Sequence, residues 1–474
     1  MALNSSGPLS FGGGTTGQSI NLELGVSATA TASINSTSFR TLAGVASGQI
    51  SVSNFYGKSN SYGFALYIGV YSPATAGGYS GTNYGSGLCL DSQSNIYWTY
   101  FQTSGVTTTA SLVKANSSGV TQTYVYPFNG AAIEFSCWQM GYYASAGVVI
   151  QPPTSNRTPT LYGSSLNRIY PANISPQYGY STQNGAVNSA GEVLVGARLN
   201  TNPPYQYKNG LIKLNSAGTV LTVYSFDGAN NQTSHGLLLR SDGSFVIYAY
   251  TGSYVTVYPF AANLTMSTNW QYSISLSQQT SSLCIDTSNN IFVGSEADRI
   301  IMRLNSSYDP THRVRVDISG SGNTFTTYAM KAYGSTLYVF AHDSSYAYVI
   351  ALSASTLDIQ WINRFAPGGS LSAGRQGIAV GAQGVYFVLA ISGDPNSAFI
   401  CNIPLTGVPS NSSKSIGGGV TLTWTIMSGS VVAQSLPAKV SQGTQSLTLT
   451  TNQNITNTAG TSPAVPVNVK TIFP

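Results

Sequence analysis

This 474-residue chain has few charged residues, because Asp, Glu, Lys and Arg together make up 7% of it, against about 25% in an ordinary soluble domain. Lys and Glu are also the usual exposed helix formers, so their scarcity argues against a mainly helical protein. In their place stand 50 Gly and 31 Tyr residues with abundant Ser and Thr. These residue types suit strands and tight turns, so the composition predicts an all-β fold.

The scarcity of charge excludes several classes of partner. The 19 basic and 14 acidic residues give a net charge of +5 without any basic run, whereas nucleic-acid-binding proteins cluster Lys and Arg, so we expect no nucleic-acid partner. No apolar stretch reaches the about 18 residues that a membrane span needs. The first ten residues lack the charged region and apolar core of a secretory signal, so we expect no such signal.

Cysteine and histidine are equally sparse. Cys89, Cys137, Cys284 and Cys401 lie far apart, without a CxxC pair or a histidine at metal-ligand spacing. We expect them to act as small buried apolar residues. The three histidines, His235, His312 and His342, are likewise separated. We therefore predict no metal site and no cofactor.

A seven-residue pattern recurs seven times through the middle of the chain. Each copy is a turn-like stretch rich in Asp, Asn, Ser and Gly that ends in two apolar residues. The copies begin at Asp91, Tyr143, Asn188, Arg240, Asp286, Ala332 and Gly381, at intervals of 45 to 52 residues. Blades of four short strands repeat at about 40 to 50 residues. The repeat predicts a seven-bladed β-propeller over residues 61–410.

Each repeat unit contains four expected strands. One precedes the turn, as at 282–286, and a second follows it, as at 291–296. A third, as at 211–218, leads through an Asn-Ser-Gly hairpin into a fourth, as at 219–226. The position two residues before each turn should fall on the innermost strand, where the blades converge: Cys89, Gly141, Ala186, Leu238, Cys284, Met330 and Ala379.

The last repeat supplies only three strands, near 376–380, 384–391 and 397–403. A propeller closes by pairing strands from its two chain ends, which removes the open edges. We prefer 63–71 as the fourth strand of this blade over 420–427. Residues 411–474 form a C-terminal β-rich segment with expected strands near 419–427, 445–451 and 465–472. A small separate domain and strands packed on the propeller rim both remain open for it.

Residues 1–60 differ from the repeats. The segment 19–25 alternates like a strand, 36–44 is typical of a short helix that ends at Gly44, and 50–59 alternates again. A module of this size buries its own apolar face poorly, so we expect it to dock on another surface.

The run GPLSFGGGTTGQSINLELG, followed by RTLAG and ISVSNFYGKS, resembles an N-terminal module of tailed-bacteriophage structural proteins. The resemblance covers about the first 60 residues and implies a virion protein that attaches to other virion proteins through this small adaptor module. The attachment residues that it implies are Phe39, Arg40, Leu42, Phe55 and Tyr56. An ordinary β-module without a docking role is the alternative.

No catalytic constellation is evident. His342, Asp343 and Ser344 are triad residue types, but neighbours on an extended chain point in different directions. Glu296 and Asp298 form the one close acidic pair on a possible active face, and Arg299 beside them favours a surface ion pair over a glycosidase site. We therefore predict that the protein is not an enzyme.

Four tyrosines are candidate ligand-binding residues. Tyr178 and Tyr180 lie between two blades, and Tyr205 and Tyr207 lie between two strands of one blade. Both loop types open on the same face of a propeller, and exposed tyrosines stack on sugars or anchor protein interfaces. The alternative is that they only cover their own loops.

These features predict a non-enzymatic phage virion structural protein, made in the host cytoplasm and found in the extracellular particle. The propeller would serve host-surface glycan, receptor or protein contact in a tail fibre or tail tip. A purely structural neck, baseplate or capsid-decoration protein is the first alternative, and an extracellular carbohydrate-active enzyme is the second. Oligomeric state and position in the particle remain open.

Overall fold

The computed structural model describes most residues between Leu3 and Ile472. Its gaps of five or more residues are 24–28, 57–65, 70–82, 116–120, 129–138, 152–159, 163–167, 171–179, 201–206, 227–232, 274–279, 372–376, 391–397, 442–447 and 450–468, and shorter gaps fall in the N-terminal module and in several turns. All structural statements below concern the described residues.

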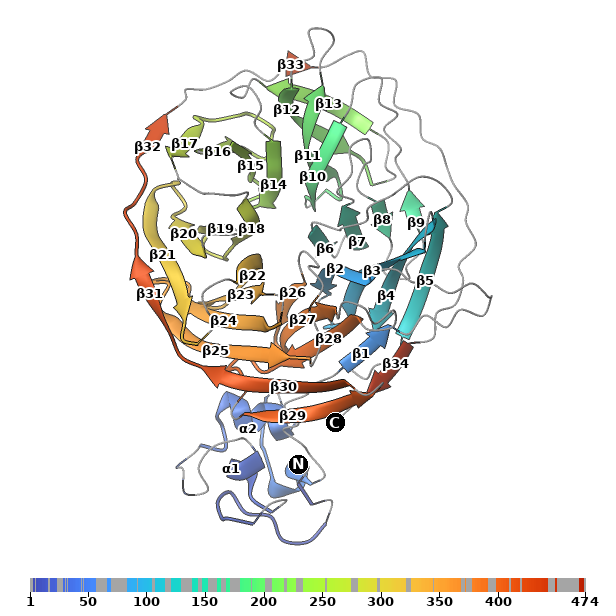
Figure 1. Ribbon diagram of the computed structural model, residues 1–474, viewed down its shortest axis with the longest axis vertical. Coiled ribbons are helices and arrows are strands. Elements are labelled where there is room, and N and C mark those ends of the chain that lie inside the picture. Colours follow the sequence, from blue (N-terminus) through green and yellow to red (C-terminus); the bar gives the residue numbers. More distant parts are fainter. Residues whose placement is uncertain are drawn as a thin grey trace.

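The strands of these residues form seven sheets arranged around a ring (Figure 1). We number the sheets in chain order. Sheet 1 contains β2 (Asn83–Leu90), β3 (Ile96–Ser104), β4 (Thr107–Ala115) and β5 (Thr121–Phe128). Sheet 2 contains β6 (Gln139–Tyr143), β7 (Gly147–Gln151), β8 (Thr160–Tyr162) and β9 (Arg168–Tyr170). Sheet 3 contains β10 (Tyr180–Val187), β11 (Val193–Asn200), β12 (Tyr207–Leu214) and β13 (Val220–Phe226).

Sheet 4 contains β14 (Thr233–Leu239), β15 (Phe245–Thr251), β16 (Tyr254–Phe260) and β17 (Trp270–Ser273). Sheet 5 contains β18 (Thr280–Ile285), β19 (Ile291–Ser295), β20 (Ile300–Leu304) and β21 (Pro310–Ile318). Sheet 6 contains β22 (Thr326–Tyr333), β23 (Thr336–His342), β24 (Ala347–Ser353) and β25 (Ile359–Ala366). Sheet 7 contains β26 (Ile378–Gly381), β27 (Gly384–Ala390), β28 (Ala398–Ile403) and β1 (Leu66–Gly69).

The first strands of the sheets line the centre of the ring. Each of them contacts the first strand of the next sheet, and β26 contacts β2, so the circle is closed. The chain is therefore a β-propeller, as the repeat predicted. All seven positions of the expected inner-strand column lie on these strands. Cys89 and Cys284 are buried there, and Cys401 is buried on β28, which confirms a packing role for these three; Cys137 lies outside the described residues.

The turns of the repeat owe their shape to their own side chains. In sheet 5, the Asp286 carboxylate accepts hydrogen bonds from the backbone N–H groups of Ser288 and Asn290 at 2.9 and 2.8 Å. The fourth turn residue, Asn289, has a φ of 64°. This left-handed conformation is cheapest for Gly and Asn, which explains why those residue types mark the repeat.

The faces of neighbouring sheets pack against one another. Between sheets 6 and 7 the buried aromatic side chains include Phe340, Phe365 and Phe387. Between sheets 5 and 6, Val314 and Val316 of β21 face the apolar side chains of sheet 6. Alternation along β21 then places four polar side chains on its opposite face: Thr311, Arg313, Arg315 and Asp317.

The first and the last strands of the propeller pair in sheet 7. β1 pairs with β28 in antiparallel register, with Tyr67 opposite Ile400 and Ile68 opposite Phe399. The preferred closing strand at 63–71 is therefore confirmed. The competing segment, 420–427, is β30 (Val420–Met427), which pairs instead with β25 of sheet 6.

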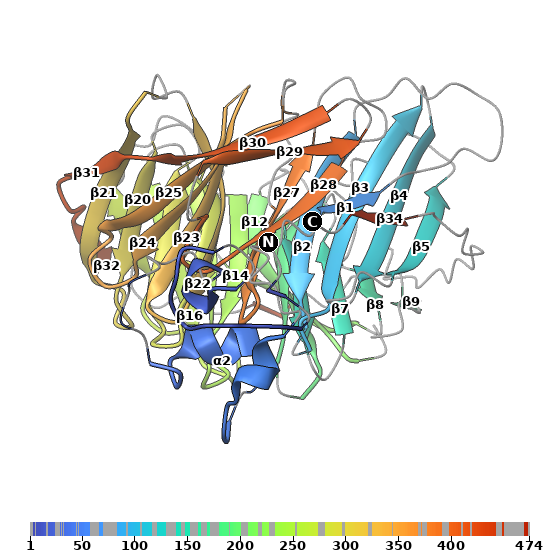
Figure 2. The same cartoon turned by 90° about the horizontal axis from the view of Figure 1, so that it is seen from below.

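The C-terminal segment runs around the outside of the ring in the reverse order of the sheets (Figures 1 and 2). After the β29–β30 hairpin on sheet 6, it adds one outer strand to each of four further sheets. These strands are β29 (Ser412–Gly417) and β30 on sheet 6, β31 (Gly429–Ala433) on β21, β32 (Lys439–Ser441) on β17, β33 (Thr448–Leu449) on β13 and β34 (Val469–Ile472) on β1. We call β30 to β34 with their described connections the belt. Of the two arrangements left open for this segment, the structure has strands on the propeller rim.

The N-terminal module contains α1 (Ile20–Glu23), α2 (Thr37–Ala43) and the 3₁₀ helix η1 (Val52–Phe55), and it lies outside the ring of sheets. The predicted helix at 36–44 is confirmed. The predicted strands at 19–25 and 50–59 are wrong, because both segments contain a helical turn. Each contributes an apolar residue to a small shared core, which a single turn can do as well as a strand.

This core also corrects the expectation that the module buries its own apolar face poorly. The buried side chains in it come only from the first 55 residues: Leu3, Ile20, Phe39, Leu42, Ala43, Ile50 and Phe55. Phe39 and Phe55 are 1% and 0% exposed and meet edge to face, with ring centroids 6.0 Å apart. The module therefore has a hydrophobic core of its own.

Candidate contact surface on the rim

Charged and aromatic groups gather where the belt crosses from sheet 5 to sheet 4. Lys439, the first residue of β32, places its Nζ 3.9 Å from the centroid of the Trp270 ring. The same Nζ lies 2.8 Å from Asp309 Oδ1 and donates a hydrogen bond of 2.7 Å to the Ser307 carbonyl. Although β32 is the outermost strand of its sheet, the Lys439 side chain is only 17% exposed. We call Trp270, Ser307 and Asp309 the lysine site.

The propeller itself holds the lysine site in place. Asn305 Oδ1 accepts hydrogen bonds from the N–H groups of Ser307 and Asp309 at 3.0 and 2.8 Å, which fixes the hairpin between β20 and β21. The buried Tyr272 hydroxyl, from β17, donates to the Tyr308 carbonyl and joins sheet 4 to this hairpin. Every group that receives the ammonium therefore comes from sheets 4 and 5, and the belt supplies only the lysine.

The electrostatics of the site favour the ion pair. Hydrogen bonds from Lys439 and then Asn305 hold the pKa of the Asp309 carboxyl below its ordinary value, although burial opposes them. Asp309 is 52% exposed, so solvent screens its attraction to the ammonium. A cation over a Trp face contributes about 0.5–1 kcal/mol at an exposed site. The ion pair itself is screened by solvent. The Trp270 ring and the Ser307 carbonyl add selectivity for an ammonium group to it.

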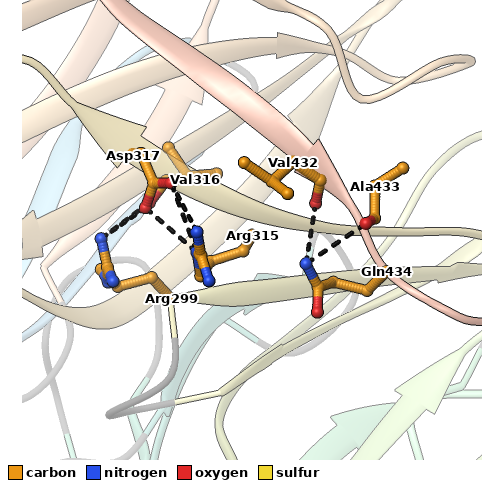
Figure 3. Close-up of polar contacts among 7 residues, drawn as sticks. All are labelled: Arg299, Arg315, Val316, Asp317, Val432, Ala433 and Gln434. Atoms are coloured by element: carbon orange, nitrogen blue, oxygen red, sulfur yellow. Dashed lines mark hydrogen bonds and ion pairs between the residues drawn. The ribbon is translucent and has the colours of Figure 1, made fainter.

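A second polar cluster lies on β21, where β31 pairs with it (Figure 3). Asp317 receives two guanidinium groups, with Arg299 Nη1 at 2.6 Å and Arg315 Nη2 at 2.9 Å. Arg315, and after it Arg299, hold the pKa of the Asp317 carboxyl below its ordinary value. One carboxylate between two guanidinium groups leaves this part of the rim positive, and the Arg315 side chain is 41% exposed.

The outer edge of β31 is the open edge of sheet 5 within the described residues. Gln434 N–H donates to the Arg313 carbonyl at 2.8 Å, and Ser319 N–H donates to the Ser428 carbonyl at 2.9 Å. Hydrogen-bonded pairs alternate along an antiparallel ladder, so the backbone groups of Gly429, Val431 and Ala433 point outward. The Gln434 side-chain amide donates to the Ala433 carbonyl at 3.3 Å (Figure 3), which satisfies one group of this edge.

Exposed apolar side chains follow the belt. Ile426, Val432, Leu436 and Val440 are 45%, 38%, 50% and 48% exposed. Apolar side chains beside charged groups on an open strand edge are typical of protein-contact surfaces. The rim of sheets 4 to 6 is therefore the described surface best suited to bind another protein.

The predicted tyrosines fall at one end of sheet 3. Tyr180 begins β10 opposite Leu199, and Tyr207 begins β12 opposite Asn200. The backbone thus brings both positions to the same end of the sheet, with β11 between them. Tyr178 and Tyr205 lie outside the described residues, so their predicted clustering stays a prediction.

The predicted attachment residues have mixed positions. Phe39, Leu42 and Phe55 are buried in the core of the N-terminal module. Arg40 is partly buried, and its guanidinium donates to Asn35 Oδ1 at 2.9 Å and to the Gly48 carbonyl at 3.1 Å. The Tyr56 hydroxyl donates to the Gly7 carbonyl at 2.6 Å. These five side chains make contacts that hold the module together. They determine the shape of its surface but do not themselves cover it.

The groups considered for catalysis do not converge in the described residues. His342 is 6% exposed, and burial lowers the pKa of its imidazole. Asp343 accepts hydrogen bonds from its own turn, including one of 2.7 Å from Tyr346 N–H. Glu296 and Asp298 lie outside the described residues, while Arg299 pairs with Asp317. Burial raises the pKa of the Cys284 thiol to about 12, so it is not a ready nucleophile.

Among the described residues, no three His, Cys, Asp or Glu side chains are close enough to hold a metal ion. In the same part of the chain, no helix is both long and apolar enough to cross a membrane.

Sequence reasoning missed the lysine site. One signal was present, because Lys439 is the only charged residue between Lys414 and Lys470. An isolated charge in so long an uncharged stretch needs a partner if it is buried. The partners, Trp270 and Asp309, are more than 120 residues away in the sequence, so only the folded ring brings them together.

No protein-family model matches the sequence, and no curated protein matches it. The structure is similar to virginiamycin B lyase from Staphylococcus aureus, with 10% identity, 71% of this chain and 98% of that chain covered, and a TM-score of 0.48. It is also similar to streptogramin B lyase, with 12% identity, 72% and 98% covered and a TM-score of 0.47. A third similar structure is the Dos1 propeller, with 10% identity, 71% of this chain and 95% of that chain covered, and a TM-score of 0.44. At these identities and TM-scores, no ligand, partner or activity is transferred to this chain.

Proposed function

We propose that this chain is a non-enzymatic structural protein of a tailed-phage virion. Residues 1–60 attach it to another virion protein, and the belted propeller presents surfaces for further contact. A tail-fibre or tail-tip position, with contact to a host-surface glycan or receptor, is the role we favour.

The observation that carries the proposal is the N-terminal module. The segment that resembles the phage module has its own hydrophobic core, and no described propeller residue contributes to that core. A module that folds on its own core can serve as an adaptor at the start of otherwise different chains. Its exposed apolar side chains, Phe11 at 42% and Val52 at 37%, are better candidates for the contact than the buried Phe39. Phe11 stacks on Phe39, with ring centroids 5.9 Å apart, so the core supports it from behind.

The rim surface supports a second candidate, a purely structural neck, baseplate or head-decoration protein. The apolar side chains along the belt, from Ile426 to Val440, suit contact with protein better than contact with sugar. A protein of this kind would bind only other virion proteins.

Incorporation into particles tests the attachment role. We expect Phe11→Ser to lower the amount of this chain in purified particles by about tenfold, as loss of an interface anchor does. Leu221→Ser, at a 49% exposed position on β13, is the matched control and should leave incorporation unchanged. Normal incorporation of a chain that lacks residues 1–56 would exclude attachment through this module.

Host-cell adsorption separates the two candidates. A tail-fibre role predicts that the purified protein binds host cells and competes with particles for adsorption. Stoichiometric incorporation into particles together with no binding to host cells would support the purely structural role.

A further inference from the structure

The belt is held unevenly along its length. β31 pairs with β21 through five residue pairs, from Val314–Ala433 to Ile318–Gly429. By contrast, β32 pairs with β17 through three residue pairs, and β33 pairs with β13 through two. Five residue pairs therefore fix the belt up to Ala433, three and two pairs hold β32 and β33, and four pairs hold β34 on β1.

A connection without strand pairing separates these two parts. Residues 434–438 belong to no strand, and Leu436 in their middle is 50% exposed. Among the described residues, Arg313 holds this connection at two points: its Nη1 donates to the Ser435 carbonyl at 3.0 Å, and its carbonyl accepts from Gln434 N–H at 2.8 Å. An exposed connection outside the strands, before a short docked strand, suits the exchange of an element between identical chains.

The docked part carries one strongly specific contact. Lys439 Nζ contacts Trp270, Asp309 and the Ser307 carbonyl together, and the hydrogen bonds of Asn305 and Tyr272 form this site without the belt. The site thus binds an ammonium group on an extended strand. A second copy of the chain presents the same lysine on the same strand.

We propose that the belt exchanges between copies at this connection, so that the lysine site of one copy receives Lys439 of another. Exchange replaces each contact within a chain by an identical contact between chains. The balance therefore depends on chain concentration and on the conformation of 434–438. The lysine site becomes an interaction site whose ligand is the lysine-bearing β32 strand of a second copy. This inference does not depend on a role in a virion.

Cross-linking of two differently marked chains tests the exchange. Gln271 and Val440 are direct partners in the β17–β32 ladder, so cysteines at these positions lie within disulfide reach. Full chains carrying Gln271→Cys and Val440→Cys separately are co-expressed and oxidised. We expect a disulfide-linked dimer that contains one chain of each kind.

The matched control replaces Val440→Cys by Val432→Cys. Val432 is also an exposed belt residue, but it pairs with Arg315 on sheet 5. The Val440→Cys mixture should give about tenfold more mixed dimer than this control. Equal yields from the two mixtures, with an internal disulfide in a chain that carries both Gln271→Cys and Val440→Cys, would overturn the proposal.

The rate of exchange tests the role of the lysine. Exchange makes the same Lys439 contact that it breaks, so Lys439→Met in either chain should leave the final yield of mixed dimer unchanged. When separately purified chains are mixed, the substitution should speed the appearance of that dimer several-fold, because β32 is released more readily. Lys414→Met, at the other end of the C-terminal segment, should leave the rate unchanged. A rate that Lys439→Met does not alter would contradict a role of the lysine site in the exchange.

Discussion

Single side chains set the turns of this propeller. Asp91 and Asp286, at the same place in sheets 1 and 5, each accept two backbone hydrogen bonds within their own turn. Asn188 does the same in sheet 3, with hydrogen bonds of 3.1 and 2.9 Å from Ala190 and Glu192. All three residues therefore fix the turn through a side-chain oxygen that accepts hydrogen bonds. The negative charge of Asp is not required for this.

This comparison predicts the effect of two substitutions at one position. Asp286→Ala removes an acceptor from two backbone N–H groups and should lower stability by about 1–2 kcal/mol. Asp286→Asn keeps the acceptor of these two N–H groups and gives up only the hydrogen bond that Oδ2 accepts from Asn290 Nδ2 at 2.8 Å, so it should cost clearly less. Thermal unfolding followed by circular dichroism would measure both. A loss for Asp286→Asn as large as that for Asp286→Ala would show that charge matters in this turn.

His342 predicts a pH dependence of stability. Burial lowers the pKa of its imidazole in the folded chain, so the unfolded chain takes up the proton more readily. Stability should be constant above about pH 6.5, the ordinary histidine pKa, and should fall as the pH drops towards the lowered folded-state pKa. His342→Gln should remove this fall between pH 7 and 5. Unfolding midpoints across that range provide the measurement, and a fall in His342→Gln as large as in the wild type would contradict this role of His342.

The belt is the element that covers the outer edges of the sheets. Without it, β25, β21, β17 and β13 would be the outer strands of sheets 6, 5, 4 and 3. Exposed strand edges pair with other chains and promote aggregation. The belt also leaves its own edge exposed at β31, where the Gln434 side chain satisfies only part of the outward backbone.

One glycine controls how closely the belt approaches sheet 5. A Cβ at Gly429 would lie 2.6 Å from the Asp317 carbonyl oxygen and 2.6 Å from Ile362 Cδ1. Gly429→Ala should therefore push β31 away from β21 and lower stability by about 1–3 kcal/mol. Limited proteolysis should then cut the belt faster than in the wild type. Ser430→Ala, at the exposed neighbouring residue, is the control, and equal cutting of the two variants would show that close packing at Gly429 is unimportant.

The sequence predicted those structural features that are determined by residues close together in the chain. The turns and the inner-strand column were predictable, because residues such as Asp286 and Asn289 shape their own turn. The path of 420–427 was not, since an alternating strand fits any open edge, and only the assembled ring selects β25. The same holds for Lys439, whose partners are brought near by two different sheets. In the N-terminal module, segments of a few residues were too short to distinguish a strand from a helical turn.

Across the whole molecule, sheet 7 joins the two ends of the propeller. β1 lies between β28 on one side and β34 on the other, and four residue pairs connect β1 to β34. The first strand of the propeller is thus held on both edges by residues that come hundreds of positions later in the chain. We expect this strand to control the integrity of the ring.

Tyr67→Pro tests that expectation. Proline cannot donate a backbone hydrogen bond and is excluded from central strands, and Tyr67 pairs with both Ile400 and Thr471. The variant should open sheet 7, lower the unfolding midpoint by several degrees and enlarge the hydrodynamic radius. Tyr254→Pro, at the first residue of β16, where proline is better tolerated, is the comparison. An unchanged ring in Tyr67→Pro would mean that the inner strands alone suffice for closure.

The reverse path of the belt has a consequence for how the protein is made. A ribosome delivers the seven sheets in order, but the strands that complete sheets 6, 5, 4, 3 and 7 all belong to residues 412–472. Folding during synthesis proceeds from the N-terminus, so most of the ring must wait with unpaired outer edges until residues 412–472 have been made. A chain that stops before these residues would carry those edges unsealed, so the belt acts as a check that the segment after the ring is present before the fold is complete.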